Sequence, residues 1–195
     1  EISAELSRRL LAEGHHSVNF AIVAAGEHAA SPHHDPGARM VGVGDGVLCD
    51  FGGTMADEFG VGYCSDITRC VWIGEPPVQA ADAYEVLRAA QQAAVDAAAP
   101  GVAAAAVDAA ARDMIAAAGF GECFVHRTGH GIGAEEHEDP YVVADNFDPL
   151  VTGNVFSIEP GIYVPGSFGF RLEDIVALDH AGSSRLNVAE HALAI

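Results

Sequence analysis

Basic residues are scarce in this chain of 195 residues. Lysine and arginine together number 9 against 28 aspartates and glutamates, which gives a formal net charge of −19 at pH 7. Binding to the phosphate backbone of a nucleic acid depends on clustered positive charge. The composition therefore excludes nucleic-acid binding as a first interpretation, and we expect most of the negative charge to lie on a solvated acidic surface.

Cysteines are also few, and long apolar runs are missing. The four cysteines form no C-x-x-C pair and no dense disulfide framework, which favours buried, reduced thiols at Cys49, Cys64, Cys70 and Cys123. No run of about 20 apolar residues could span a bilayer. No early stretch has the basic start and apolar core of a signal peptide. We therefore expect a cytoplasmic protein with no membrane partner.

The remaining composition is that of a globular protein. Half of the residues are hydrophobic and 19% are charged, which favours a folded chain over a disordered one. Period and turn signals predict helices, strands and hairpins. In chain order, the predicted elements are a helix over 3–13, a strand over 18–25, a turn-rich segment over 31–46, a hairpin of 47–51 with 66–73, helices over 78–99 and 102–118, and a second hairpin of 155–159 with 170–178.

The two predicted hairpins begin with similar sequences. Residues 44–50 (GDGVLCD) and 153–159 (GNVFSIE) both read as a turn, an apolar strand and a carboxylate. Each is followed by a second acid on the next apolar run, Asp66 in the first half and Glu173 in the second. Because strand side chains alternate between faces, antiparallel pairing can bring both acids of a hairpin to one side. The similarity suggests two similar halves around a shared sheet.

Four clustered carboxylates need compensation, because like charges raise one another's pKa and are costly to desolvate. Divalent metal ions supply it. Our candidate for a nitrogen ligand is His130, which lies among glycines in the sequence GHGIG. Oxygen-rich ligands with one imidazole suit Mn²⁺, Co²⁺, Fe²⁺ or Zn²⁺. Four carboxylates with a neutral histidine carry a charge that two divalent ions balance, and a bridging water would be acidified toward hydroxide.

Four motifs together resemble those of the metallopeptidases with the pita-bread fold, most closely the Xaa-Pro dipeptidase (prolidase) and Xaa-Pro aminopeptidase branch. The motifs are HRTGHGIG at 126–133, GYCSDITR at 62–69, SIEPGIY at 157–163 and RLEDIV at 171–176. The resemblance implies an α/β fold of two pseudo-symmetric halves, with a curved, mostly antiparallel sheet covered by helices. It also implies two divalent ions, manganese first, with cobalt, zinc or iron as alternatives, held by Asp50, Asp66, His130, Glu159 and Glu173.

The resemblance further implies roles for residues around this centre. His33 matches an active-site histidine near the substrate. His126 and His137 match histidines that line the pocket and stabilise the substrate carbonyl or the tetrahedral intermediate, as donors aimed at a developing oxyanion do. Glu159 would be both a metal ligand and the proton shuttle. Arg171 lies two residues before Glu173 and could hold a ligand carboxylate by a charge-assisted hydrogen bond.

Other polar residues receive structural interpretations. We expect His34 to be structural or exposed, and Asp174 to face away from the ligands toward a backbone donor. No motif surrounds His15, His16, His28, His180 and His191, which we treat as surface residues. The connection from Asp50 to Asp66 is longer than is usual in the family, and it makes Asp57 an alternative ligand.

The predicted function is hydrolysis of the peptide bond before proline by a metallopeptidase, acting on a peptide or dipeptide. A methionine aminopeptidase-like enzyme is one rival, and a non-catalytic peptide-binding module with the same fold is another. Members of the branch usually carry an N-terminal domain, and nothing in this sequence corresponds to it. We therefore expect residues 1–195 to form a single catalytic domain, with homodimer formation left open.

Overall fold

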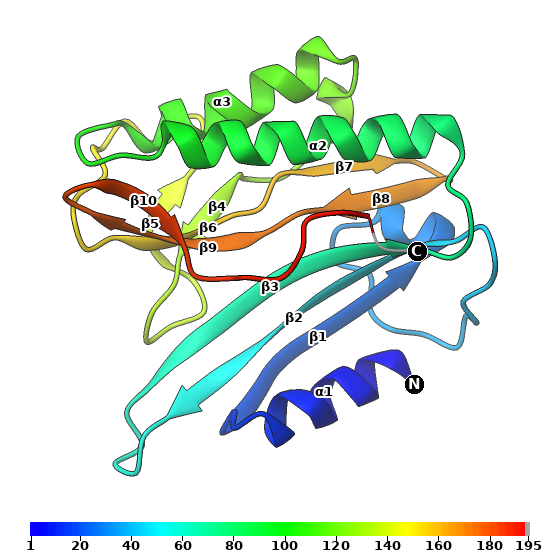
Figure 1. The fold of residues 1–195 in the computed structure, drawn as a ribbon, viewed down its shortest axis with the longest axis horizontal. Helices are drawn as coiled ribbons and strands as arrows, with labels where there is room; N and C mark the ends of the chain where they lie inside the picture. Colours follow the sequence, from blue (N-terminus) through cyan, green and yellow to red (C-terminus); the bar gives the residue numbers. More distant parts are fainter. Residues whose placement is uncertain (194–195) are drawn as a thin grey trace.

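Antiparallel strands and three long helices make up the computed structural model, which describes residues 1–193 (Figure 1). The helices are α1 (Ile2–Ala12), α2 (Val78–Ala97) and α3 (Ala104–Ala117), with short 3-10 turns η1 (Gly26–Ala30) and η2 (Gly121–Cys123). The strands are β1 (Ser17–Ala25), β2 (Gly46–Ala56), β3 (Gly62–Trp72), β4 (Gly129–Gly131), β5 (Glu138–Val142), β6 (Val155–Ile158), β7 (Gly161–Val164), β8 (Phe168–Arg171), β9 (Asp174–Asp179) and β10 (Gly182–Arg185).

Helices cover the strands on two sides. In Figure 1, α2 and α3 run side by side over one face, while α1 lies beyond β1 on the other. The strands form a three-stranded sheet in the order β1-β2-β3, a five-stranded sheet in the order β10-β9-β6-β4-β5, and the two-stranded pair β7-β8. The prediction of an α/β fold with antiparallel strands under helices is confirmed. The strands are divided among separate hydrogen-bonded sheets, whereas the sequence suggested one shared sheet.

The first hairpin is confirmed but longer than predicted. Asp50 lies opposite Thr68, and Gly52 lies opposite Asp66. Both acids therefore sit inside their strands, where we had expected them at the strand ends, and their common face is confirmed. Much of the segment between Asp50 and Asp66, which the glycines suggested was a loop, continues the antiparallel pairing of β2 with β3. Gly52 and Gly53 are needed there, because a Cβ at either position would overlap a backbone oxygen of a neighbouring strand.

The second hairpin is confirmed in its pairing, but its second strand is shorter than predicted. β6 pairs directly with β9, and the small β7-β8 pair is inserted between them in the chain. The predicted strand over 170–178 is thus divided at Leu172 and Glu173, which lie outside regular strands. As a result, Glu159 and Glu173 lie just beyond the last residue pair of β6 and β9, at the end that faces the β1-β2-β3 sheet.

The alanine-rich helices α2 and α3 cover the core on one side, as predicted. Small residues such as Ala90 and Ala111 are fully buried, which allows α2 and α3 to pack closely on each other and on the strands. Beneath them, Tyr84 packs edge-on against Phe170, with ring centroids 5.2 Å apart. None of the helices in the described part of the chain is long and apolar enough to cross a membrane.

Candidate metal centre and peptide pocket

A cavity of about 570 Å³ opens where the two larger sheets meet. Its wall contains every residue that the sequence predicted for the site: Asp50, Asp66, His130, Glu159, Glu173, His33, His126, His137 and Arg171. These residues come from both halves of the chain, and β3 and β9 contact each other along the junction. The structure therefore brings the whole predicted set together in one place.

The innermost part of the cavity is a cluster of buried carboxylates around one imidazole. Ligand atoms of Asp66, His130 and Glu173 all lie within 4.8 Å of one another. His130 Nε2 is 3.3 Å from Glu159 Oε1 and 3.8 Å from Asp66 Oδ2. A buried oxygen of Asp50, of Asp66 and of Glu173 has no hydrogen-bond partner among the described residues. Such unpartnered buried oxygens are what a divalent cation would satisfy.

The backbone around His130 fixes which ring nitrogen faces this cluster. Its Nδ1 lies 3.0 Å from the Gly131 carbonyl oxygen. Since a carbonyl only accepts, Nδ1 carries a hydrogen, and Nε2 is the nitrogen that faces the carboxylates. Nε2 donates to Glu159 when the ring is protonated, and it offers a lone pair to a cation when the ring is neutral. The flanking Gly129 is required, because a Cβ there would overlap the Ser157 carbonyl. The tautomer is the one that a metal-ligating histidine needs.

Three of the carboxylates hold their protons strongly when no cation compensates them. Burial, followed by the charges of Asp50 and Glu159, raises the pKa of Asp66 well above its ordinary value. Burial and the Asp66 charge do the same to the pKa of Glu173. Burial also raises the pKa of Asp50, although Arg171 opposes it. This is the behaviour expected of like charges that share a dry site.

Glu159 is the exception and stays ionised. Burial alone would raise its pKa, but the hydrogen bond and charge of His130, together with the charge of Arg171, outweigh burial and lower the pKa of Glu159 to about 2. Ser157 Oγ also donates to Glu159 Oε1 over 3.0 Å and accepts from the His130 backbone N–H at the same distance. Ser157 thus ties the imidazole and this carboxylate into one arrangement.

Arg171 is the buried cation of the site, and its predicted role toward a carboxylate can now be specified. Its Nη2 donates to Asp50, across the sheet junction. Its Nη1 donates to the Tyr163 hydroxyl over 2.8 Å, and its Nε donates to Thr68 Oγ1 over 3.2 Å. Thr68 in turn donates to Glu173 Oε2 over 2.7 Å. Arg171 therefore links a carboxylate of the first half to one of the second.

His126 lines the cavity, but both of its ring nitrogens are engaged. Nδ1 lies 2.7 Å from the Arg127 carbonyl oxygen and must donate to it, so Nε2 accepts from the Tyr163 hydroxyl at 2.8 Å. Burial lowers the pKa of His126 to about 4, which keeps the ring neutral near pH 7. His137 packs edge-on against the His130 ring at 4.1 Å and is exposed, and His33 is exposed at the cavity wall.

Several secondary interpretations need correction. Asp57 caps the exposed hairpin tip by accepting from the backbone N–H groups of Phe59 and Val61, so its reading as an alternative ligand is wrong. Asp174 does face away from the cavity, but its partners are side chains and not a backbone donor. One of them is His191, which we had treated as a surface residue. Of the cysteines, Cys70 is buried, while the other three are half-buried.

Sequence reasoning missed Thr68, Ser157 and Tyr163. Each lies inside a motif that the sequence did show, and Ser157 precedes Glu159 by two residues, a spacing that puts side chains on one face of a strand. Polar residues at this spacing from a predicted ligand were the available signal. Tyr163 gave none beyond its place in SIEPGIY, because its contacts reach across the β7-β8 pair.

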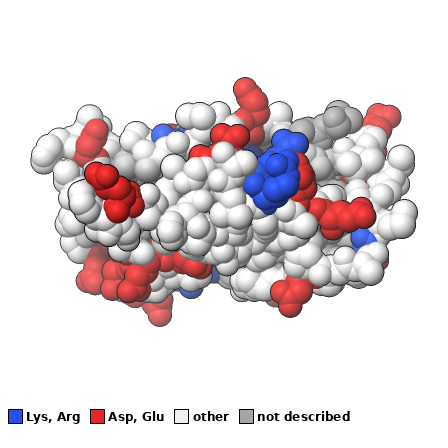
Figure 2. Space-filling view, turned by 90° about the horizontal axis from the view of Figure 1, so that it is seen from below, with Lys and Arg blue, Asp and Glu red and all other residues white. Residues whose placement is uncertain are grey.

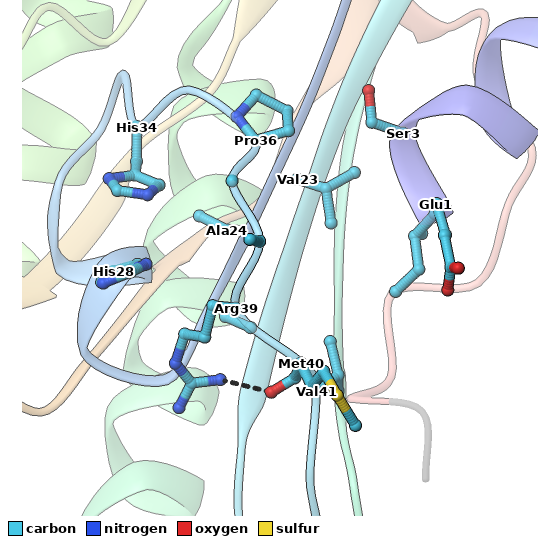
Figure 3. Close-up of a pocket in the computed structure, with 14 residues that line it drawn as sticks. Glu1, Ser3, Val23, Ala24, His28, His34, Pro36, Arg39, Met40 and Val41 are labelled. Carbon is cyan, nitrogen blue, oxygen red and sulfur yellow. Dashed lines mark hydrogen bonds between the residues drawn. The ribbon is translucent and has the colours of Figure 1, made fainter.

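A second cavity, of about 510 Å³, lies between α1, β1 and the segment over 34–41 (Figure 3). Its histidines, His28 and His34, stack with ring centroids 4.2 Å apart. Its cation, Arg39, is already paired with Asp45 and Glu27. On the face shown in Figure 2, acidic side chains lie at several separate places and basic side chains gather in one main group. Among residues 1–193, the one group of side chains placed to hold a metal ion is Asp66, His130 and Glu173 of the first cavity.

Comparisons with known proteins agree with the motifs. Residues 1–180 match metallopeptidase family M24. A probable dipeptidase PepE of Mycobacterium tuberculosis is 50% identical over 195 residues, which is 100% of this chain and 51% of that protein. The Xaa-Pro dipeptidase of Lactobacillus delbrueckii is 49% identical over 161 residues, covering 83% of this chain and 42% of that protein. The chain thus spans about half the length of the curated relatives it matches.

Solved structures show the same similarity. The dipeptidase PepE from Mycobacterium ulcerans superposes with a TM-score of 0.95 at 52% identity, over 99% of this chain and 51% of that one. A prolidase from Thermococcus sibiricus gives a TM-score of 0.95 at 43% identity, over 100% of this chain and 52% of that one. These superpositions confirm the fold that the sequence motifs implied.

Proposed function

Because the chain belongs to metallopeptidase family M24, we propose that it is the catalytic domain of an enzyme that hydrolyses the peptide bond preceding proline. The observation that carries the proposal is the group of unpartnered buried carboxylate oxygens around His130 Nε2. Relatives named dipeptidase and Xaa-Pro dipeptidase support the choice of a short peptide substrate. An Xaa-Pro dipeptidase fits this combination best, with an Xaa-Pro aminopeptidase as the near variant.

Family membership implies the use of divalent metal, and we propose that two ions, manganese first, are bound here. Their ligands would be Asp50, Asp66, His130, Glu159 and Glu173. When bound, such ions supply a Lewis acid for the scissile carbonyl and a water that is acidic enough to act as hydroxide. The donor set fits, since it combines oxygen ligands with one imidazole and carries excess negative charge in a buried place.

Glu159 is the residue that we propose moves the proton. It is ionised and half-buried, and Ser157 and His130 fix its position, so it can accept a proton from the attacking water. The same carboxyl group can then deliver this proton to the leaving nitrogen of proline. A tertiary amide nitrogen needs this protonation, because the free amine and not its anion is the leaving group.

The histidines divide into two roles in this proposal. His137 and His33 are exposed to the cavity, so they can donate to the substrate carbonyl and to the oxyanion that develops from it. His126 has no free nitrogen for this task. We assign it to holding the Tyr163 hydroxyl, which accepts from Arg171. This assignment narrows the general role that the family resemblance implied for His126.

The apolar side of the cavity suits a small cyclic side chain. Phe20, Ile22 and Val143 line the cavity, with Ile22 directly beside Asp50 on the neighbouring strand. A volume of about 570 Å³ accommodates a dipeptide. Apolar contacts with the proline ring would contribute to selectivity, although one methylene group changes such discrimination only modestly. Homodimer formation and a cytoplasmic location stay predictions.

Two measurements test the proposal. The purified chain, reconstituted with Mn²⁺, should hold about two ions and should cleave Ala-Pro faster than Met-Ala. Glu159→Gln should reduce Ala-Pro hydrolysis by about 10²–10⁴-fold, because it removes the proton acceptor. Glu58→Gln, at the exposed hairpin tip, is the matched control and should be fully active. Full metal-dependent hydrolysis by Glu159→Gln would refute the assignment, and a preference for Met-Ala would favour a methionine aminopeptidase.

A further inference from the structure

The segment that follows β10 crosses the back of the candidate metal centre. We call residues 186–191 the C-terminal strap. Figure 1 shows this part of the chain, in red, leaving β10 and running along β3 toward the C-terminus. The strap has no regular secondary structure, yet its backbone and side chains make long-range hydrogen bonds with both larger sheets.

Asn187 is the central residue of the strap. Its Nδ2 donates to the backbone oxygen of Asp66 over 3.0 Å, and its Oδ1 accepts from the backbone N–H of Ile175 at 2.6 Å. Asp66 belongs to the first sheet and Ile175 to the second. One side-chain amide therefore bridges two sheets that no continuous ladder joins, next to two of the proposed ligands.

Arg69 makes a second bridge of the same kind. Its Nη1 donates to the backbone oxygen of Glu173 over 2.5 Å, while Nη2 donates to Asp174 Oδ1 over 2.7 Å. The strap completes the arrangement, since the carbonyls of Ala189 and Glu190 both accept from the same guanidinium at 3.0 Å. Without the strap, Arg69 would lose two of the acceptors that hold its orientation.

A buried carboxylate anchors the strap at its far end. Asp174 is fully buried and accepts from Arg185 Nε at 2.8 Å and from Gln91 Nε2 at 3.0 Å. His191 Nε2 lies 2.8 Å from the same Asp174 oxygen, Oδ2. Tyr84 of α2 also donates to the His191 carbonyl over 3.0 Å. The strap is therefore fastened to a helix and to β9, directly beside Glu173.

We propose that the C-terminal strap positions two metal ligands, Asp66 and Glu173, by holding their backbone from outside the cavity. The inference rests on the proposed metal centre. Its physical basis is that ligand atoms must keep their mutual distances to within about 0.2 Å. Partners behind the ligands typically change metal affinity by about 10–100-fold when they are removed. Asn187 and Arg69 are thus positioning residues, which act through the backbone and touch neither the ion nor the substrate.

The test compares Asn187→Ala with Val188→Ala, a control in the same strap whose side chain is 96% exposed. Calorimetric titration with Mn²⁺ should show that Asn187→Ala weakens affinity about tenfold, while Val188→Ala matches the parent. The visible absorption spectrum of the Co²⁺-loaded Asn187→Ala chain should differ from that of the parent even at saturation, because the ligand geometry differs. Circular dichroism confirms that each variant is folded at the temperature of titration.

The outcomes separate this inference from the proposed function. A parent chain that binds no Mn²⁺ refutes the metal centre and the strap's role together. If the parent chain binds Mn²⁺ and Asn187→Ala shows equal affinity and an identical Co²⁺ spectrum, the positioning role of the strap is refuted while the metal centre stands. This holds whatever the melting temperature of the variant. Should Asn187→Ala fail to fold, Arg69→Lys keeps the positive charge beside Asp174 but cannot reproduce the bidentate contacts. It should show the same loss of affinity, and parent-like affinity there would overturn the inference.

Discussion

Replacing Thr68 by valine would isolate the contribution of one buried hydroxyl to the metal centre. Thr68 is fully buried on β3, and valine keeps its shape while removing the oxygen. The hydroxyl donates to Glu173 Oε2 over 2.7 Å and accepts from Arg171 Nε at 3.2 Å. Both contacts are lost in the variant, but only the first should depend on whether metal is bound.

The magnitude follows from the protonation state of Glu173. Without metal, burial and the Asp66 charge raise the pKa of Glu173, so the hydroxyl faces a neutral carboxyl group at any pH below that raised pKa. Such a hydrogen bond contributes about 0.5–1.5 kcal/mol, against about 1.5–3 kcal/mol for one to a charged group. The hydrogen bond from Arg171 to Thr68 is lost in the metal-free and in the metal-bound chain alike, so its contribution cancels in the comparison. The variant should therefore lose about 1–1.5 kcal/mol more with metal than without it, which is roughly a tenfold weaker metal affinity.

Urea unfolding of the metal-free and Mn²⁺-saturated chains measures both losses, at one fixed free-metal concentration. Thr152→Val, at an exposed position far from the cavity, is the control and should change neither value measurably. Equal destabilisation of Thr68→Val in both states would show that the hydroxyl does not orient Glu173 for metal. A calorimetric titration then has to give an unchanged dissociation constant as well.

Two further predictions concern pH and the backbone near His130. The pKa values of Asp66 and Glu173 in the folded chain are raised above their unfolded value of about 4. Between the unfolded and the folded pKa values, the metal-free folded chain binds more protons than the unfolded chain, so its stability falls as pH rises through this range. Metal must displace these protons, so its effect on the melting temperature should be larger at about pH 8 than at about pH 5; a pH-independent effect would contradict this. Gly129→Ala should abolish metal binding or folding, because its Cβ would overlap the Ser157 carbonyl, whereas Gly37→Ala meets no atom within 4 Å and should behave as the parent in the same Mn²⁺ titration.

The first half of the site could be predicted from the sequence because it depends on a local rule. Alternation along two neighbouring strands puts Asp50 and Asp66 on one face, and the observed register agrees. The hairpin length could not be predicted, since glycine signals a turn and a close strand approach alike. Gly52 and Gly53 serve the second purpose.

The second half was less predictable because the choice of strand partner is a long-range property. The run after Phe168 has the same apolar character whether it pairs with β7 or with β6, and the structure divides it between the two. The contacts of Asp174 show the same limit. Its partners come from α2, β3, β10 and the strap, and no local pattern brings such distant residues together.

The proposed role of the strap has a consequence for when the centre can form during synthesis. At about 5–20 residues/s, roughly 7–27 s pass between the addition of Asp50 and that of Asn187. Arg171, which pairs with Asp50, and Asn187, which holds the backbone of Asp66, are both added late in this interval. The proposed role of the strap therefore predicts that metal loading follows the addition of Asn187. A variant shortened to end at Arg185 would keep each proposed ligand, yet it would lack the Asn187 amide at Asp66 and the two strap carbonyls at Arg69.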